Sequence, residues 1–146
     1  MSDHQPTRAT HGSPKSPLIL NDHKIQCYVL EDGRRVLSGR GMQDAFGMGQ
    51  SHGGKLKDFM TAKAIKPFIS EELAMELDKP IRFTRPGRGG VVAMGYEATI
   101  LQRICDAVLS ARKAGIFDGK PKALLIAEQC ELLTRAFAKV GIIALI

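Results

Sequence analysis

The residues whose types and spacing could do chemistry lie in a glycine-rich segment from Lys79 to Tyr96. Arg82, Arg85 and Arg88 are distributed along it, and it contains no Asp or Glu. A guanidinium group is a planar fork that binds phosphate oxygens, and a glycine-rich turn lets the backbone approach a partner closely. The segment therefore predicts a polyanionic partner, and it predicts no reaction.

Basic residues also gather earlier in the chain. Between Arg34 and Lys66 there are seven Lys or Arg residues against two acidic ones. If the hairpins expected in these two regions lie side by side, their cations form one basic stripe. The residues that would contact phosphates are Arg82, Arg85, Arg88, Arg34, Arg35 and Lys55. The alternative is a solvated surface neutralised by counter-ions.

The segment from Gly49 to Leu56 is close to the phosphate-binding P-loop pattern, G-x-x-x-x-G-K-[ST], but departs from it. Leu56 stands where a Ser or Thr hydroxyl would hold magnesium. A short amphipathic helix is expected before this loop, whereas a P-loop follows a buried strand. We interpret the match as coincidental and the segment as an ordinary solvated loop. The alternative is a loop whose Lys55 and Lys57 contact a phosphate backbone.

No set of residues has the spacing of a catalytic or metal site. Cys27, Cys105 and Cys130 lie far apart, and the chain has no H-E-x-x-H, G-x-S-x-G or clustered His and Cys. Turn and helix positions account for Asp32 and Asp44 without a catalytic role. We therefore expect a protein that is not an enzyme, with no catalytic residue, metal or cofactor and with buried, reduced thiols.

Composition indicates one basic domain. The chain has 146 residues, a net charge of +6 and 44% hydrophobic residues. A basic surface favours nucleic acid, an anionic membrane surface or an acidic protein as partner. No segment approaches the about 20 apolar residues of a membrane span, and no signal peptide is visible. We expect a cytoplasmic protein without a membrane partner.

The first elements are an arm and a hairpin. Residues 1–18 are rich in Pro, Ser, Thr and His and lack periodicity, which predicts a flexible N-terminal arm. The pattern of Lys24–Leu30 predicts a strand, Asp32-Gly33 a tight turn and Arg35–Leu37 the returning strand. The segment Lys79–Tyr96 predicts a second hairpin.

Three short helices are expected between the hairpins. Ser38 can cap the first, which Gly47 ends. The second covers Lys55–Ala64. Ser70 can cap the third, which Pro80 ends.

Two longer helices are expected at the end of the chain, over Glu97–Ala114 and Pro121–Lys139. The second carries a heptad seam made of Ile126, Cys130, Leu133, Phe137 and Val140. Packing against the preceding helix explains the seam, and a homodimer through this last helix is the alternative. The apolar residues 141–146 either dock as a strand or helical turn, or precede a missing C-terminal domain.

These elements predict an α+β fold with two antiparallel β-hairpins packed on several short helices and a C-terminal helical hairpin. A single domain would cover residues 19–146.

The order of several segments resembles the N-terminal region of phage and prophage proteins that carry the phage protein-sixty-three C-terminal domain. The matching segments are Tyr28–Ser38, Phe46-Gly47, Lys66–Leu73, Gly95–Thr99 and Val140–Ile146. The element order is also similar to the BRO-N and KilA-N modules of phage antirepressors. The resemblance implies a regulatory, DNA-associated role in a bacterial host cell, a chain that continues beyond Ile146, and no catalytic residues.

Together these observations lead us to expect a phage-type nucleic-acid-binding or regulatory module that acts without catalysis. The alternative is a protein-interaction module with an acidic partner surface, such as an inhibitor of a host defence or repressor complex.

Overall fold

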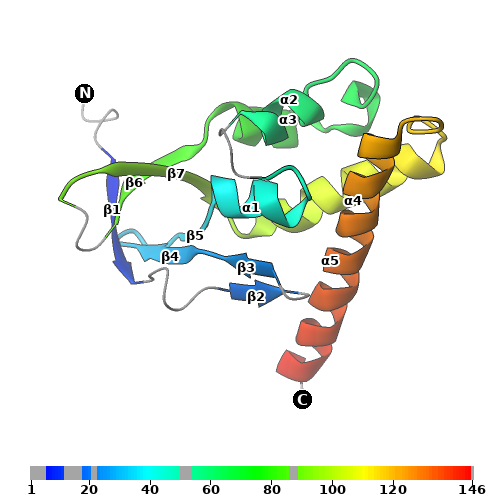
Figure 1. The fold of residues 1–146 in the computed structure, drawn as a ribbon. Coiled ribbons are helices and arrows are strands. Elements are labelled where there is room, and N and C mark those ends of the chain that lie inside the picture. Colours follow the sequence, from blue (N-terminus) through cyan, green and yellow to red (C-terminus); the bar gives the residue numbers. More distant parts are fainter. Residues whose placement is uncertain (1–5, 12–17, 21–22, 50–53, 86–88, 146) are drawn as a thin grey trace.

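The computed structural model describes residues 6–11, 18–20, 23–49, 54–85 and 89–145, and it has a small β-barrel at one end and helices at the other (Figure 1). The barrel is closed in the order β1-β4-β5-β7-β6. Its strands are β1 (Thr7–His11), β4 (Cys27–Leu30), β5 (Arg35–Ser38), β6 (Ile81–Thr84) and β7 (Val92–Glu97). The predicted α+β class is confirmed, and the two hairpins are joined into one closed sheet.

The two hairpins are neighbours in this sheet. Strand β7 lies between β6 and β5, antiparallel to both, and Leu37 of β5 is opposite Tyr96 of β7. The first hairpin turns at Asp32 and Gly33 as predicted, with Gly33 at a φ of 89° and its N–H donating to the Leu30 carbonyl. The side-by-side arrangement on which the basic stripe depended is therefore present in the backbone.

The expectation of a flexible arm over residues 1–18 is wrong for Thr7–His11, which form β1. This strand pairs antiparallel with β4 and parallel with β6, so it closes the barrel. Without β1, strands β4 and β6 would be edge strands with unpaired backbone groups. Hydrogen bonds to these groups, together with the burial of Ala9, hold β1 in place. Residues 1–5 and 12–17 of the expected arm lie outside the described residues, and β2 (Leu18–Leu20) pairs with β3 (His23–Ile25).

The predicted strand Lys24–Leu30 is interrupted at Gln26, which separates β3 from β4. In the barrel strands, every second side chain points into the interior of the barrel. The rings of Tyr28 and Phe83 meet there, with centroids 5.1 Å apart. Leu30 and Val36 complete the buried interior together with Ala9.

The short helices begin at the predicted caps. Ser38 Oγ accepts from the Gly41 N–H at the start of α1 (Gly39–Ala45), and Ser70 Oγ accepts from the Leu73 N–H at the start of α3 (Glu71–Asp78). Helix α2 (Lys55–Met60) ends four residues earlier than predicted, because the chain tightens at Thr61 and turns into the 3-10 helix η2 (Lys66–Phe68).

The predicted C-terminal helix pair is α4 (Thr99–Lys113) and α5 (Pro121–Leu145), which pack against each other. Cys130 and Leu133 of the heptad seam are fully buried, and Ile126 and Phe137 are half-buried against the same core. These four seam residues are thus used within the chain and do not form a free dimer face. Helix α5 continues through the apolar ending to Leu145, so no final strand forms.

No helix in the described part of the chain combines the length and the apolar character needed to cross a membrane.

Candidate nucleic-acid interface

The arginines of the two hairpins do not form one continuous stripe. By strand alternation Arg35 of β5 and Arg82 of β6 both lie on the outer face of the barrel. Between them, Leu37 and Tyr96 pack into the helical core, and the Tyr96 hydroxyl donates to the Leu77 carbonyl at 3.4 Å. The helices that cover the middle of the sheet therefore separate the two groups of cations.

Arg34 is held by the turn that precedes it. Its Nε donates to the Asp32 carboxylate at 2.8 Å, and its Nη2 donates to Thr7 Oγ1 at 3.4 Å. The backbone N–H of Arg34 also donates to Asp32, and this bond is the main reason that the pKa of Asp32 lies below its usual value. Arg34 thus stabilises the turn and its contact with β1.

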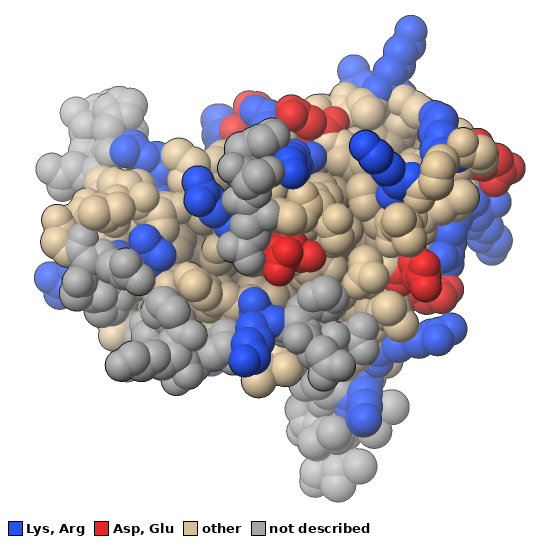
Figure 2. Space-filling model, viewed as in Figure 1, with Lys and Arg blue, Asp and Glu red and all other residues tan. Residues whose placement is uncertain are grey.

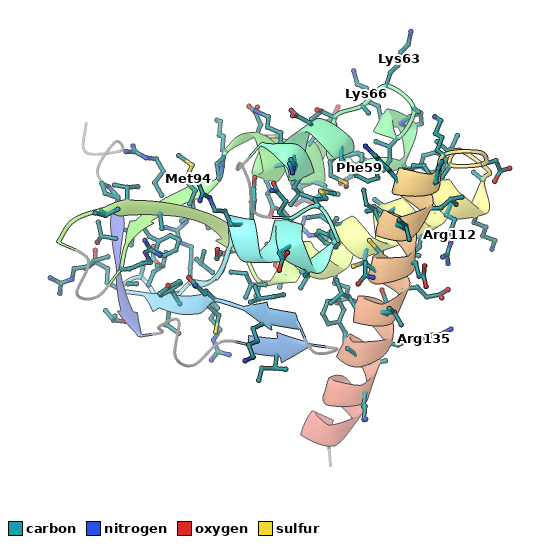
Figure 3. All side chains as sticks on the ribbon, viewed as in Figure 1. Phe59, Lys63, Lys66, Met94, Arg112 and Arg135 are labelled. Carbon is teal, nitrogen blue, oxygen red and sulfur yellow. The ribbon has the colours of Figure 1, made fainter. Side chains whose placement is uncertain are left out.

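The lysines of the first basic region are dispersed. Lys55 Nζ donates to the Met48 carbonyl at 3.0 Å, and Lys57 pairs with Asp78 at 2.9 Å. Lys63 and Lys66 project from the α2–α3 connection, far from Met94 on β7 (Figure 3). Lys55 thus fixes the loop between α1 and α2, of which residues 50–53 lie outside the described residues.

Arg35 lies beside a different, mainly apolar hollow on the outside of the first hairpin. Cys27, Val29, Leu37 and Ala98 line this hollow, which has a volume of about 420 Å³. Arg35 therefore lies beside a different hollow from the arginines of the second hairpin, and that hollow is mainly apolar.

Arg8 joins the second hairpin, and the sequence reasoning missed it. In the parallel pairing of β1 with β6, Arg8 is opposite Thr84, two residues from Arg82 on the same face. Arg8, Thr10, Thr84 and Arg85 line a polar hollow of about 560 Å³. The signal was weak, because Ala9 is the one apolar residue of the segment Thr7–His11, which therefore lacks the alternation of a hydrophobic strand.

A second hollow lies on the other side of Arg85, and we call it the α1–β7 groove. It has a volume of about 500 Å³ and is lined by residues that include Arg40, Leu56, Pro80, Arg85, Met94 and Tyr96. Met94 is opposite Arg82 in the sheet and lies on the side of β7 away from the barrel interior (Figure 3).

Arg85 is shared by both hollows and is incompletely bonded. Its Nε is buried and has no hydrogen-bond partner among the described residues. A buried N–H without an acceptor is costly, so this position favours an anion that supplies one. On the face seen in Figure 2, no Asp or Glu is visible over the barrel end at the left, and the acidic side chains in view lie over the helical part.

The structure thus brings Arg82 and Arg85 together with Arg8 and Arg40, which we call the arginine cluster. Arg34, Arg35 and Lys55 line neither of the two hollows, and Arg88 lies outside the described residues. Within the described ranges, no group of three or more His, Cys, Asp or Glu side chains is placed to hold a metal ion. The four guanidinium groups of the arginine cluster can bind phosphates.

Comparisons of this chain with protein-family models, with curated proteins and with solved structures found no match.

Proposed function

We propose that this chain is a phage-type regulatory module that binds nucleic acid without catalysis, in the cytoplasm of a bacterial host cell. The observation that carries the proposal is the position of Arg85 between two hollows, with Arg8 in one and Arg40 in the other. Arg82 lies on the same outer face of β6. Four guanidinium groups, from β1, α1, β6 and the residue that follows β6, then line a path that a phosphate backbone could occupy.

Contacts of this kind are independent of sequence and depend strongly on salt. Each phosphate that an arginine neutralises releases counter-ions, so log affinity falls with log salt by about 0.7–0.9 per phosphate. The module would therefore place itself on nucleic acid through the arginine cluster, and base specificity would need further contacts.

The test is a salt series of binding to single-stranded and duplex oligonucleotides. The variant Arg8→Gln/Arg85→Gln should lower the steepness of the salt dependence by about two phosphate contacts. A matched control is Lys63→Gln/Lys66→Gln, which removes the same charge from exposed positions remote from the cluster. A flat salt dependence of the unaltered chain, or equal losses in both variants, would contradict the proposal.

A second candidate is an acidic protein surface, as in an inhibitor of a host defence or repressor complex. It is favoured by Val91 and Met94, which are 57% and 54% exposed next to the cluster, because a phosphate backbone needs no apolar contact. Capture of partners from a host lysate, with and without nuclease, separates the two. A partner retained after nuclease treatment favours protein, and one that is lost favours nucleic acid.

A further inference from the structure

The α1–β7 groove combines cations with an apolar floor. Arg40 and Arg85 supply charge, and Pro80, Val92 and Met94 supply apolar surface. Its volume of about 500 Å³ is in the range of sites that enclose small ligands or parts of larger ones. A site for phosphates alone would have no use for the apolar part.

Met94 is the most exposed apolar side chain that lines the groove. It is 54% exposed in the middle of a barrel strand, and its cross-strand neighbour is Arg82. Met94 is not isolated, because Val92, two residues away on the same face of β7, also lines the groove and is 37% exposed. An exposed apolar patch beside arginines favours a ligand that combines an apolar surface with a negative charge.

An unpaired nucleotide has both properties. Its base presents a flat apolar face that can lie against Met, Val or Pro side chains, and its phosphate can accept from a guanidinium group. In a duplex the base faces are stacked on one another, so a surface groove meets mainly phosphates and sugars. The combination of lining residues therefore favours a single strand over a duplex.

The position of Arg85 indicates how a single strand would run across this surface. Its buried Nε lacks an acceptor among the described residues, and its side chain borders both the groove and the hollow that contains Arg8. A phosphate at Arg85 would follow a base seated in the groove, and the next phosphate would lie toward Arg8. The path is continuous along one strand.

We infer that the α1–β7 groove holds one unpaired nucleotide, so that the module prefers single-stranded to duplex nucleic acid. This inference rests on the proposed function and adds to it the kind of nucleic acid and the role of Met94. The base lies on Met94 and Pro80, and its phosphate binds Arg85 and Arg40.

Three fluorescent probes of equal length test the inference with the full chain: oligothymidine, the same backbone with abasic sites at every position, and a duplex. Oligothymidine should bind about tenfold more tightly than the abasic strand, because the two differ in bases and not in phosphates. The variant Met94→Ser should remove most of this difference and leave the affinity for the abasic strand and the duplex unchanged. Met75→Ser is the matched control, since Met75 is 64% exposed on α3 and does not line the groove.

The outcomes separate the two proposals. Equal affinity of the unaltered chain for oligothymidine and the abasic strand overturns the inference while phosphate binding stands. The same holds if Met94→Ser keeps the full preference for oligothymidine over the abasic strand. Tighter binding of the duplex than of either strand also overturns it. Absence of binding to all three probes overturns the proposed function itself, and with it the inference.

Discussion

Gly95 of β7 lies directly against Leu37 of β5, so close that a Cβ atom at position 95 would be 2.2 Å from the Leu37 carbonyl oxygen. The same Cβ would lie 2.7 Å from a methyl group of Val36. Only glycine permits this approach of the two hairpins, which closes the barrel and places β7 beside α1.

Replacement of Gly95 by alanine should therefore lower the free energy of unfolding by about 1–3 kcal/mol, because the strands must separate to admit the methyl group. Urea unfolding followed by circular dichroism measures the loss. The control is Gly39→Ala, where the new Cβ would lie at an ordinary 3.4 Å from the Met94 carbonyl oxygen. Equal stability of Gly95→Ala and the unaltered chain would refute the close approach.

Gln43 is a buried amide that connects α1 to α2. Its Nε2 donates to the Gly49 carbonyl at 3.0 Å, and its Oε1 accepts from the Leu56 N–H at 3.2 Å. The variant Gln43→Met keeps the volume but leaves both backbone groups without these bonds, so a loss of about 1–3 kcal/mol of stability is expected. Thermal or urea unfolding of Gln43→Met should be compared with that of Gln102→Met, at an exposed position on α4. A pair of variants with the same stability would mean that these bonds contribute little.

The three cysteines should react at very different rates. Cys105 and Cys130 are fully buried, and a hydrogen bond between them together with burial raises the pKa of the Cys130 thiol. Cys27 is half-buried beside the apolar hollow on the first hairpin. A disulfide reagent should therefore label Cys27 in the native protein, and the other two only after unfolding. In Cys27→Ser the rapid reaction should disappear, and rapid labelling that persists would place a core thiol within reach of solvent.

Stability should fall in acid partly through two exposed ion pairs. A hydrogen bond from Lys57 lowers the pKa of Asp78 below its ordinary value of 3.8, and one from Arg112 lowers the pKa of Glu131 below its ordinary value of 4.5. Because the folded-state pKa values are the lower ones, the stabilisation is present above these unfolded-state values. It is lost as the pH falls through the folded-state pKa values.

The variant Asp78→Asn/Glu131→Gln should accordingly show a shallower loss of stability between about pH 5 and about pH 2 than the unaltered chain. The effect is small, since both carboxylates are exposed to solvent. Urea unfolding across this range measures it, with Asp106→Asn/Glu128→Gln as a control for net charge at exposed positions. Parallel curves for the two double variants would exclude a contribution from these pairs.

Features that depend on neighbouring residues were predictable from the sequence. Ser38 and Ser70 cap their helices, Gly33 turns the first hairpin, and Gly47 and Gly115 follow helix ends at positive φ. The physical reason is that capping, turn and helix-end geometry are satisfied within a few residues. The apolar residues of α4 likewise recur at helical spacing, and its buried face contains Ile100, Leu101, Ile104, Cys105 and Val108.

The composition of the arginine cluster was decided by tertiary structure alone. Arg8 lies in a segment that becomes a strand only because β4 and β6 offer it backbone partners. Arg35 and Arg82 belong to adjacent hairpins, yet helices packed on Leu37 and Tyr96 separate them. The sequence by itself determined that arginines would surround the second hairpin. Closure of the barrel determined which ones share a surface, because pairing between distant strands sets the positions of side chains that no local pattern relates.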